Sequence, residues 1–231
     1  MKRLLLALAT CCATSLGAQA DNVPVVVELF TSQGCSSCPP ADEFMKILAE
    51  RDDVIALSMH VDYWDYIGWK DEFADPQHAE RQRAYATHAG RRSVYTPEMI
   101  VNGDIDIIGA KPMAVATAIE THKSQPRSVE VELSRKGGQM HVAVRALQDV
   151  SGPLMVQMIR FQPERVSNIT RGENAGKVLT YINVAQDLQV IGAWDTQTDF
   201  VAAVSVPDDL PVVVLVQKQS LGRILAAARL D

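Results

Sequence analysis

Two cysteines separated by two residues carry the clearest chemical signal in this sequence, Cys35 and Cys38 in the run Cys-Ser-Ser-Cys-Pro-Pro. An apolar, β-branched run precedes them, and Phe44, Ile47 and Leu48 follow at helical spacing. A cysteine pair at a helix start suits thiol–disulfide exchange, because the free N–H groups and the positive end of the helix stabilise a thiolate. We predict Cys35 as the nucleophile and Cys38, one turn further on, as the thiol that resolves a mixed disulfide.

The same two cysteines have two alternative uses. In a non-catalytic binding module they would form an inert disulfide, but closing so short a loop contributes only about 2 kcal/mol, against about 4.7 kcal/mol for a hundred-residue loop. In a metallochaperone, Cys35, Cys38 and His60 would hold copper or zinc. No second histidine stands at ligand spacing near His60, which favours a packed histidine there. We therefore predict a redox-active pair that uses no cofactor, with both alternatives open.

Glu28 is a charged residue inside the apolar run Pro24–Phe30, which is typical of a strand buried on both faces. A carboxyl buried near the cysteines would have a raised pKa and could exchange a proton with Cys38. A solvent-facing acid at the strand end is the alternative interpretation. We predict Glu28 as the proton relay of the site.

The dipeptide Thr96-Pro97 leads from a loop into the apolar segment Glu98–Val101. X-Pro bonds are cis in only about 5–6% of cases in folded proteins, but the cysteine pair at a helix start favours the cis form here. A cis bond would turn the Thr96 backbone toward the cysteines, where its N–H and C=O could pair with an extended substrate. We predict a cis Pro97 and a substrate-pairing role for Thr96.

The elements that position these residues fall into two groups. In the first group we expect strands at 24–30 and 54–61 and helices at 41–50 and 76–90, which form a right-handed crossover. A hairpin at 98–108 and a last helix at 112–123 follow. After about residue 125, seven or eight short strand-like runs separated by turns are typical of a β-sandwich. We predict an α/β domain with a mixed sheet and flanking helices over 21–125, and an all-β sandwich-like domain over 126–231.

Together, the strand–Cys35-Ser-Ser-Cys38–helix order, the crossover and Thr96-Pro97 resemble the thioredoxin superfamily over residues 22–123. The stretch Val27–Asp42, with Tyr95–Pro97 and Arg171–Asn174, is similar to a narrower family of secreted bacterial thioredoxin-like proteins of unknown function. The resemblance implies a thioredoxin-like fold, a nucleophilic Cys35, a resolving Cys38 and a cis Pro97. Gly34 stands where thioredoxins have a tryptophan, so the direction of electron flow does not carry over.

The first twenty residues have the layout of a secretory signal peptide. Two basic residues follow Met1, an apolar run extends from Leu4 to Leu16, and Ala18-Gln19-Ala20 offers a small-residue cleavage site. The apolar run is too short to span a membrane. Cleavage after Ala20 would remove the other two of the four cysteines. We predict a periplasmic or secreted protein that does not span the membrane.

The charge balance limits the classes of partner. The 231 residues include 22 Lys and Arg against 28 Asp and Glu, a net charge of -6. No basic field is available to neutralise phosphates, which argues against a nucleic-acid partner. We expect protein or small-molecule thiols and disulfides as substrates, and a redox partner that resets the pair.

Two further segments have less specific patterns. The stretch 62–69 is rich in aromatic residues and is predicted to cap a core edge, with a peptide groove as the alternative. The polar stretch Arg171–Gly176 is predicted as a turn between strands, with a role in binding or docking as the alternative.

Overall fold

The computed structural model describes residues 23–109, 111–207 and 209–231, and the predicted signal peptide, residues 1–20, lies outside them. Within these ranges the elements are, in chain order, β1 (Val25–Thr31), α1 (Pro39–Ala49), β2 (Val54–His60), the 3-10 turn η1 (Asp65–Ile67), α2 (Pro76–His88), β3 (Glu98–Val101), β4 (Ile105–Ile108), α3 (Pro112–Lys123), β5 (Val129–Lys136), β6 (Gln139–Ala146), β7 (Leu154–Asn168), β8 (Val178–Trp194), β9 (Phe200–Ser205), β10 (Val212–Lys218) and β11 (Ile224–Leu230).

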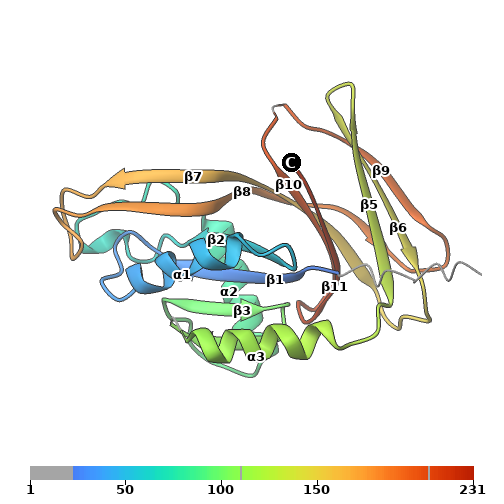
Figure 1. Cartoon of the computed structure of the whole chain (residues 1–231), viewed down its shortest axis with the longest axis horizontal. Helices are drawn as coiled ribbons and strands as arrows, with labels where there is room; N and C mark the ends of the chain where they lie inside the picture. The colour runs from blue at the N-terminus through green and yellow to red at the C-terminus, as the bar shows by residue number, and fades with distance from the viewer. Residues whose placement is uncertain (1–22, 110, 208) are drawn as a thin grey trace, which may run out of the picture.

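Eight strands form one mixed sheet in the order β11-β10-β7-β8-β2-β1-β3-β4 (Figure 1). In this sheet β1 is parallel to β2 and antiparallel to β3. All seven residues of β1 are buried, as its apolar run predicts. Val26 and Phe30 pack on the face that α2 covers, whereas Val27 and Leu29 pack against α1 and α3. Alternate side chains of β1 therefore reach two different cores.

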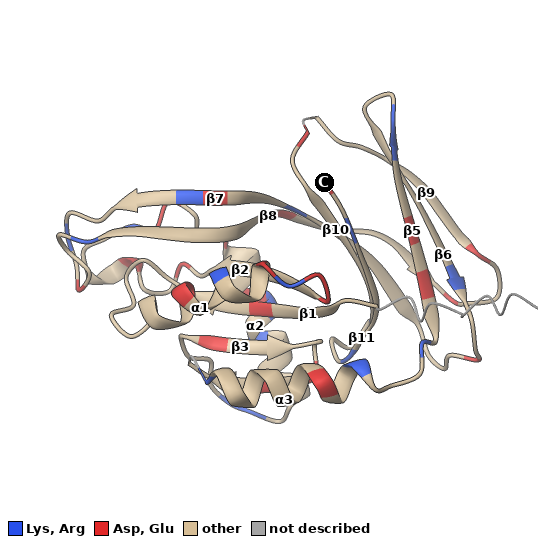
Figure 2. Ribbon diagram, in the orientation of Figure 1, with Lys and Arg blue, Asp and Glu red and all other residues tan. Residues whose placement is uncertain are grey.

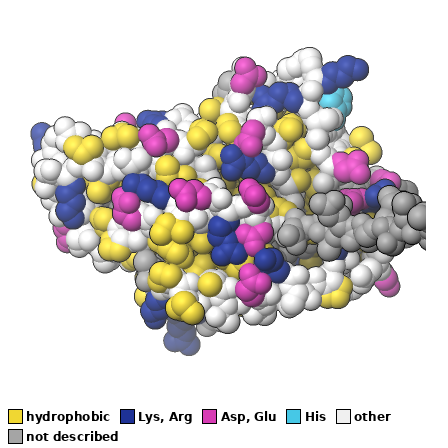
Figure 3. Space-filling model, in the orientation of Figure 1, with side chains coloured by type: hydrophobic (Ala, Val, Ile, Leu, Met, Phe, Trp, Pro, Cys, Tyr) yellow, Lys and Arg dark blue, Asp and Glu magenta, His cyan; other side chains and the backbone are white. Residues whose placement is uncertain are grey.

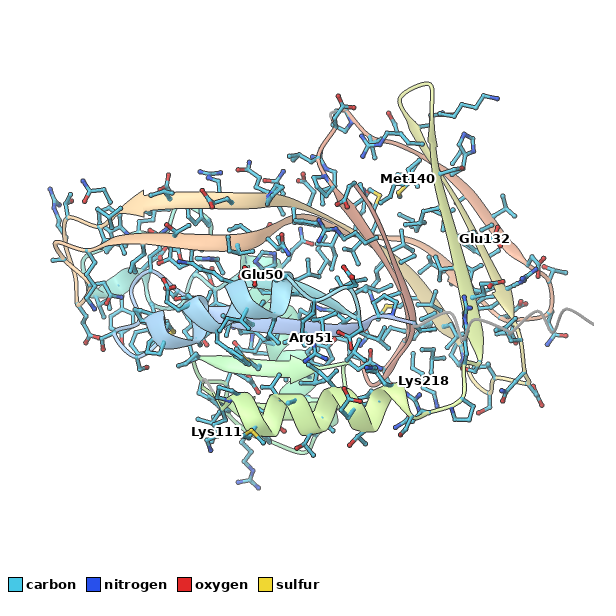
Figure 4. All side chains as sticks on the ribbon, viewed as in Figure 1. Glu50, Arg51, Lys111, Glu132, Met140 and Lys218 are labelled. Carbon is cyan, nitrogen blue, oxygen red and sulfur yellow. A yellow bond between two sulfur atoms is a disulfide. The ribbon has the colours of Figure 1, made fainter. Side chains whose placement is uncertain are left out.

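The second sheet is small and antiparallel, with the order β5-β6-β9. Its inner face packs against one end of the large sheet. Met140 of β6, labelled in Figure 4, is fully buried in a cluster that includes Val156 of β7 and Val214 of β10. A sandwich-like core is therefore present, but it lies between a three-stranded sheet and part of an eight-stranded one.

The all-β domain predicted over 126–231 is thus only partly present. Four of its strands, β7, β8, β10 and β11, belong to the same sheet as β1 to β4. Phe30 of β1 and Leu215 of β10 lie in one core cluster, and Ser58 of β2 is in register with Val184 of β8. The prediction assigned every late apolar run to a separate sandwich, because a sequence pattern does not show which strands pair. The sheet continues across residue 125.

β7 and β8 continue past the end of β10 as a two-stranded arm, residues 161–185, with its tip at 169–177. The arm borders β2 at its base, where Val184 is in register with Ser58. The register between β10 and β7 ends at Arg160, so β7 borders an edge beyond that residue. Pro163 lies in this stretch, where a missing N–H is tolerated. The sequence predicts a strand that ends at Phe161, and two strands in place of β8, because proline and polar residues interrupt the apolar pattern.

The turn between β3 and β4 requires a glycine at position 103. Gly103 has a φ of +72°, and a Cβ there would collide with the Gly222 carbonyl oxygen and lie 2.9 Å from Gln217 Nε2. Gly103→Ala is expected to lower the free energy of unfolding by about 2–5 kcal/mol, from backbone strain plus overpacking. Gly138 also has a positive φ but faces open space, so Gly138→Ala should cost only about 1–2 kcal/mol. Urea unfolding compares the two, and equal losses would contradict the steric explanation.

Candidate functional site

Cys35 and Cys38 are joined by a disulfide at the start of α1. Cys38 immediately precedes the helix, and its carbonyl oxygen accepts hydrogen bonds from the N–H groups of Ala41 and Asp42. Two prolines occupy the first turn of α1, where their missing N–H groups remove no helical hydrogen bond. The predicted order of strand, cysteine pair and helix is confirmed, and the positive end of α1 lies at the pair.

The cysteine pair is nearly enclosed by the protein. Cys35 is 2% exposed and Cys38 is 0% exposed, whereas Ser36 and Ser37 between them are exposed. Ser37 Oγ lies 3.4 Å from Cys35 Sγ. The serines therefore mark the side from which a partner thiol would reach Cys35.

The peptide bond between Thr96 and Pro97 is cis, as predicted. Trp64 connects this bond to the cysteine loop, because its Nε1 donates a hydrogen bond to Thr96 Oγ1 at 2.7 Å. Trp64 Cβ also lies 3.1 Å from the position that a Cβ on Gly34 would take. Gly34 directly precedes Cys35, so one tryptophan contacts both predicted halves of the site. The pairing of Thr96 with a substrate stays a prediction.

Glu28 is fully buried, but it lies against an arginine and not against the cysteines. Arg81 Nε donates to Glu28 Oε1 at 2.6 Å, and Tyr85 Oη donates to Glu28 Oε2 at 2.6 Å. Both partners belong to α2, which covers the face of β1 opposite to α1. The proton-relay role predicted for Glu28 is therefore corrected, because the side-chain alternation of β1 directs this carboxylate to the other core.

A different carboxyl, Asp42, lies on the cysteine helix, and the sequence predicted no role for it. Asp42 Oδ1 accepts a hydrogen bond from Thr31 Oγ1 at 2.8 Å, while Asp42 Oδ2 is buried without a partner among the described residues. Burial raises the pKa of Asp42 to about 7, against the opposing effects of His60 and the Thr31 hydrogen bond. The available signal was spacing, because Asp42 follows Cys38 by one helical turn.

His60, the third ligand of the alternative metal site, has other partners. Its Nδ1 lies 2.7 Å from Asp71 Oδ2, and its ring packs edge-on against Tyr181 and Phe73, with centroid distances of 4.6 and 5.4 Å. Burial alone would raise the pKa of Asp71, but His60 and two backbone N–H donors outweigh it and lower that pKa. In the described ranges, no group of three or more His, Cys, Asp or Glu side chains could hold a metal ion. In the disulfide form, His60 therefore does not combine with the cysteine pair in a three-ligand site.

Three buried polar side chains lie together behind the cysteine helix. Asp42 Oδ2, His60 Nε2 and Tyr181 Oη have no hydrogen-bond partner within the part of the chain that the structure describes. Burial, and then the charges of Asp42 and Asp71, raise the pKa of Tyr181. His60 in turn lowers the pKa of Asp42, so the groups are within electrostatic reach of one another.

The aromatic stretch 62–69 divides between the core and the surface. Tyr63 and Trp64 pack against a core cluster, as predicted for a cap at a core edge. Tyr66 is 80% exposed and stacks on Trp64 with a centroid distance of 6.3 Å. An exposed aromatic surface therefore borders the tryptophan that contacts the cysteine loop.

The tip of the arm, predicted as a turn, brings a residue from late in the chain to the cysteines. Asn174 Nδ2 donates to the carbonyl oxygens of Gln33 and Cys35, both at 2.9 Å. Figure 1 shows this tip at the same end of the molecule as the start of α1. Because 139 residues separate Asn174 from Cys35, no local pattern could have predicted the contact.

The rest of the surface carries mixed charges and a hollow away from the cysteines. Acidic and basic side chains are interspersed over the elements (Figure 2), and the face in Figure 3 carries hydrophobic side chains among both. A hollow of about 540 Å³ lies at the C-terminal end of α1, away from the cysteines. Ala49, Arg51 and Arg229 line part of it, and Figure 4 labels Arg51. No helix in the described ranges is long and apolar enough to cross a membrane.

Fold and site together define a mixed α/β protein with a Cys-x-x-Cys disulfide at a helix start. The chain belongs to the family described as "Protein of unknown function (DUF1223)", whose model matches residues 26–217. No curated protein matches the chain. The predicted membership of a family of unknown function is confirmed.

Two solved structures are similar to the chain. A protein from Agrobacterium tumefaciens, solved by X-ray crystallography, is 32% identical, with 91% of this chain and 95% of that chain covered and a TM-score of 0.79. HBP35 of Porphyromonas gingivalis is 15% identical, with 90% and 75% covered and a TM-score of 0.63. The second likeness concerns the fold alone.

Proposed function

We propose that the protein is an exported thiol–disulfide oxidoreductase, and that its N-terminal part is thioredoxin-like, as the resemblance implies. One observation carries the proposal. The Cys35–Cys38 disulfide lies at the start of a helix that also holds Asp42, a buried carboxyl whose pKa is raised to about 7. This arrangement combines a thiolate-stabilising helix end with a group that can take up or release a proton near neutral pH.

The exchange reaction takes two steps. A thiolate of a reduced substrate attacks Cys35 Sγ, the Cys35–Cys38 bond breaks, and Cys38 leaves as a thiolate that accepts a proton from Asp42. A second substrate thiolate then attacks the mixed disulfide, so that a substrate disulfide forms and Cys35 leaves as a thiolate. The substrate loses two electrons and the cysteine pair gains them. In the opposite direction Cys35 attacks a substrate disulfide and Cys38 releases the product.

A second candidate is a non-catalytic binding module with an inert disulfide. The enclosure of the pair favours it, because Cys35 is only 2% exposed and exchange requires a partner sulfur to reach that atom. The exposed Tyr66 beside Trp64 would then belong to a binding surface.

Equilibration of the purified protein in dithiothreitol and glutathione buffers, followed by thiol alkylation and mass spectrometry, separates the two candidates. An oxidoreductase should reach a reversible equilibrium, with a potential near roughly -270 mV for a reductant or roughly -120 mV for an oxidant. A pair that stays oxidised in excess dithiothreitol would instead support the binding module.

Asp42→Asn is expected to change how stability depends on pH. Because the pKa of Asp42 rises from 3.8 to about 7 on folding, the folded chain binds an extra proton between these values and loses stability as the pH rises through them. Asparagine does not titrate, so the variant should gain stability relative to the wild type over this window, by roughly 1.4 kcal/mol for each step of one in pH. Urea unfolding from about pH 4 to 8 measures the difference, and a constant difference would contradict the buried carboxyl.

The exposed neighbour Glu43 provides the matched control for this substitution. Glu43→Gln removes a carboxyl from the same turn of α1, whose charge raises the pKa of Asp42 less than burial and Asp71 do, so the pH dependence should stay close to that of the wild type. In exchange assays, Asp42→Asn should also lose a pH-dependent step near neutrality in the release of Cys38, which Glu43→Gln should retain.

A further inference from the structure

The arm reaches the cysteine loop through a closed and ordered tip. Backbone hydrogen bonds join Ile169 N to Lys177 O at 3.0 Å and Gly176 N to Ile169 O at 2.8 Å, so the two strands end in a tight loop. Asn174 lies inside this loop and is 0% exposed. Lys177 Nζ donates to Asn174 Oδ1 at 2.8 Å, which fixes the orientation of the side-chain amide.

The amide of Asn174 is the direct link between the arm and the disulfide. Its nitrogen donates to both Gln33 O and Cys35 O at 2.9 Å, and Cys35 O also accepts the N–H of Cys38 at 3.3 Å. One rigid amide therefore requires the two carbonyl oxygens of the cysteine loop to be held at a fixed separation. The disulfide ring holds one of these two carbonyl groups, because it fixes Cys35 relative to Cys38. Gln33 lies outside the ring and is held separately, since its N–H donates to Asp71 Oδ2 at 2.8 Å.

Other contacts lock the arm and the cysteine loop in the same place. Gln33 Oε1 accepts hydrogen bonds from Trp69 Nε1 at 2.7 Å and from Ser167 Oγ of β7 at 3.3 Å. Trp69 Cβ lies 3.2 Å from the position of a Cβ on Gly172, whose φ is +74°. The arm, the aromatic stretch and the loop before Cys35 thus pack as one unit around Gln33.

We propose that Asn174 is a positioning residue that stabilises the disulfide form of the Cys35–Cys38 pair over the dithiol form, so that docking of the arm is linked to the redox state of the cysteines. This inference rests on the proposed function, since it assumes that the pair is reversibly reduced. Reduction releases the Cys35–Cys38 ring and with it the fixed position of Cys35 O, which weakens the fit to the Asn174 amide. By linkage, removal of the amide must then favour the dithiol form.

The test is the redox equilibrium of the full chain in dithiothreitol buffers, for the wild type, Asn174→Ala and Asn174→Asp. Both variants should shift the equilibrium about three- to tenfold toward the dithiol, which is roughly 15–30 mV at 29.6 mV per tenfold change. Asn174→Asp should shift it at least as far as Asn174→Ala, because its carboxylate oxygens face the two carbonyl oxygens. Hydrogen exchange of residues 169–177 should rise on reduction of the wild type.

Asn183→Ala is the matched control. Asn183 is a buried asparagine on β8 whose Nδ2 also donates to a backbone carbonyl, that of Ala56, at 2.9 Å, far from the cysteine loop in sequence. Asn183→Ala should lower the free energy of unfolding, but the redox potential of its Cys35–Cys38 pair should stay at the wild-type value. A measurable wild-type equilibrium that both Asn174 variants leave unchanged would overturn this inference while the proposed function stands. A wild-type pair that cannot be reduced would overturn both.

Discussion

Cys38→Ser is expected to accumulate a mixed disulfide between Cys35 and its substrate, approaching one substrate per chain. Cys35 retains its place beside the helix end, but the sulfur that would release the substrate is gone. Cys35→Ser should lower exchange to the rate of buffer alone, because no sulfur is left on the exposed-serine side of the loop. Non-reducing electrophoresis and mass spectrometry detect the adduct, and turnover of a small disulfide measures the rate.

Stability and folding must be separated from this effect on exchange. Loss of the short disulfide loop should lower the free energy of unfolding by roughly 2 kcal/mol in either variant, which a folded protein of this size tolerates. Ser36→Ala alters an exposed residue between the cysteines and should keep wild-type exchange. A folded Cys35→Ser protein that exchanges as fast as the wild type would identify the disulfide as inert.

Local signals in the sequence predicted the parts of the site that depend on near neighbours. Two prolines directly after Cys38 predicted a helix that begins there, because proline is tolerated only in the first turn of a helix. The continuous apolar run of β1 predicted that this strand is buried on both faces. Both features are determined within a few residues of chain. The cis Pro97 was predicted from the loop that leads into β3 together with the cysteine pair at a helix start, which is distant in sequence.

The partners of the site could not be predicted in the same way. Asn174 meets Cys35 across 139 residues, and the tip that carries it follows a strand that continues past Pro163. Glu28 is buried, as one of its two interpretations required. One residue of register decides which face of β1 it occupies, and apolar neighbours on both sides give no signal for that choice. The burial of Asp42, which raises its pKa, likewise depends on packing that no local pattern shows.

Arg81→Met is expected to cause a large loss of stability. Arg81 is buried and contacts four polar side chains, those of Glu28, Tyr85, Gln157 and Gln217. Removing its charge leaves the carboxylate of Glu28 in the core with Tyr85 Oη as its remaining donor among the contacts described. The free energy of unfolding should fall by about 3–5 kcal/mol, the usual cost of a buried charge that loses its partner. Urea unfolding at neutral pH measures the loss.

A double-variant cycle shows whether the loss comes from the unpaired charge. Glu28→Leu combined with Arg81→Met removes both charges, so the double variant should be more stable than Arg81→Met alone, by on the order of 1–3 kcal/mol. If the double variant is less stable than either single variant, the side chains of Glu28 and Arg81 stabilise the core by packing rather than by charge. Because Glu28 faces α2 and not the cysteine helix, Glu28→Gln should lower stability without changing the redox equilibrium of Cys35 and Cys38. A shift of that equilibrium with Glu28→Gln would restore the proton-relay role to Glu28 and remove it from Asp42.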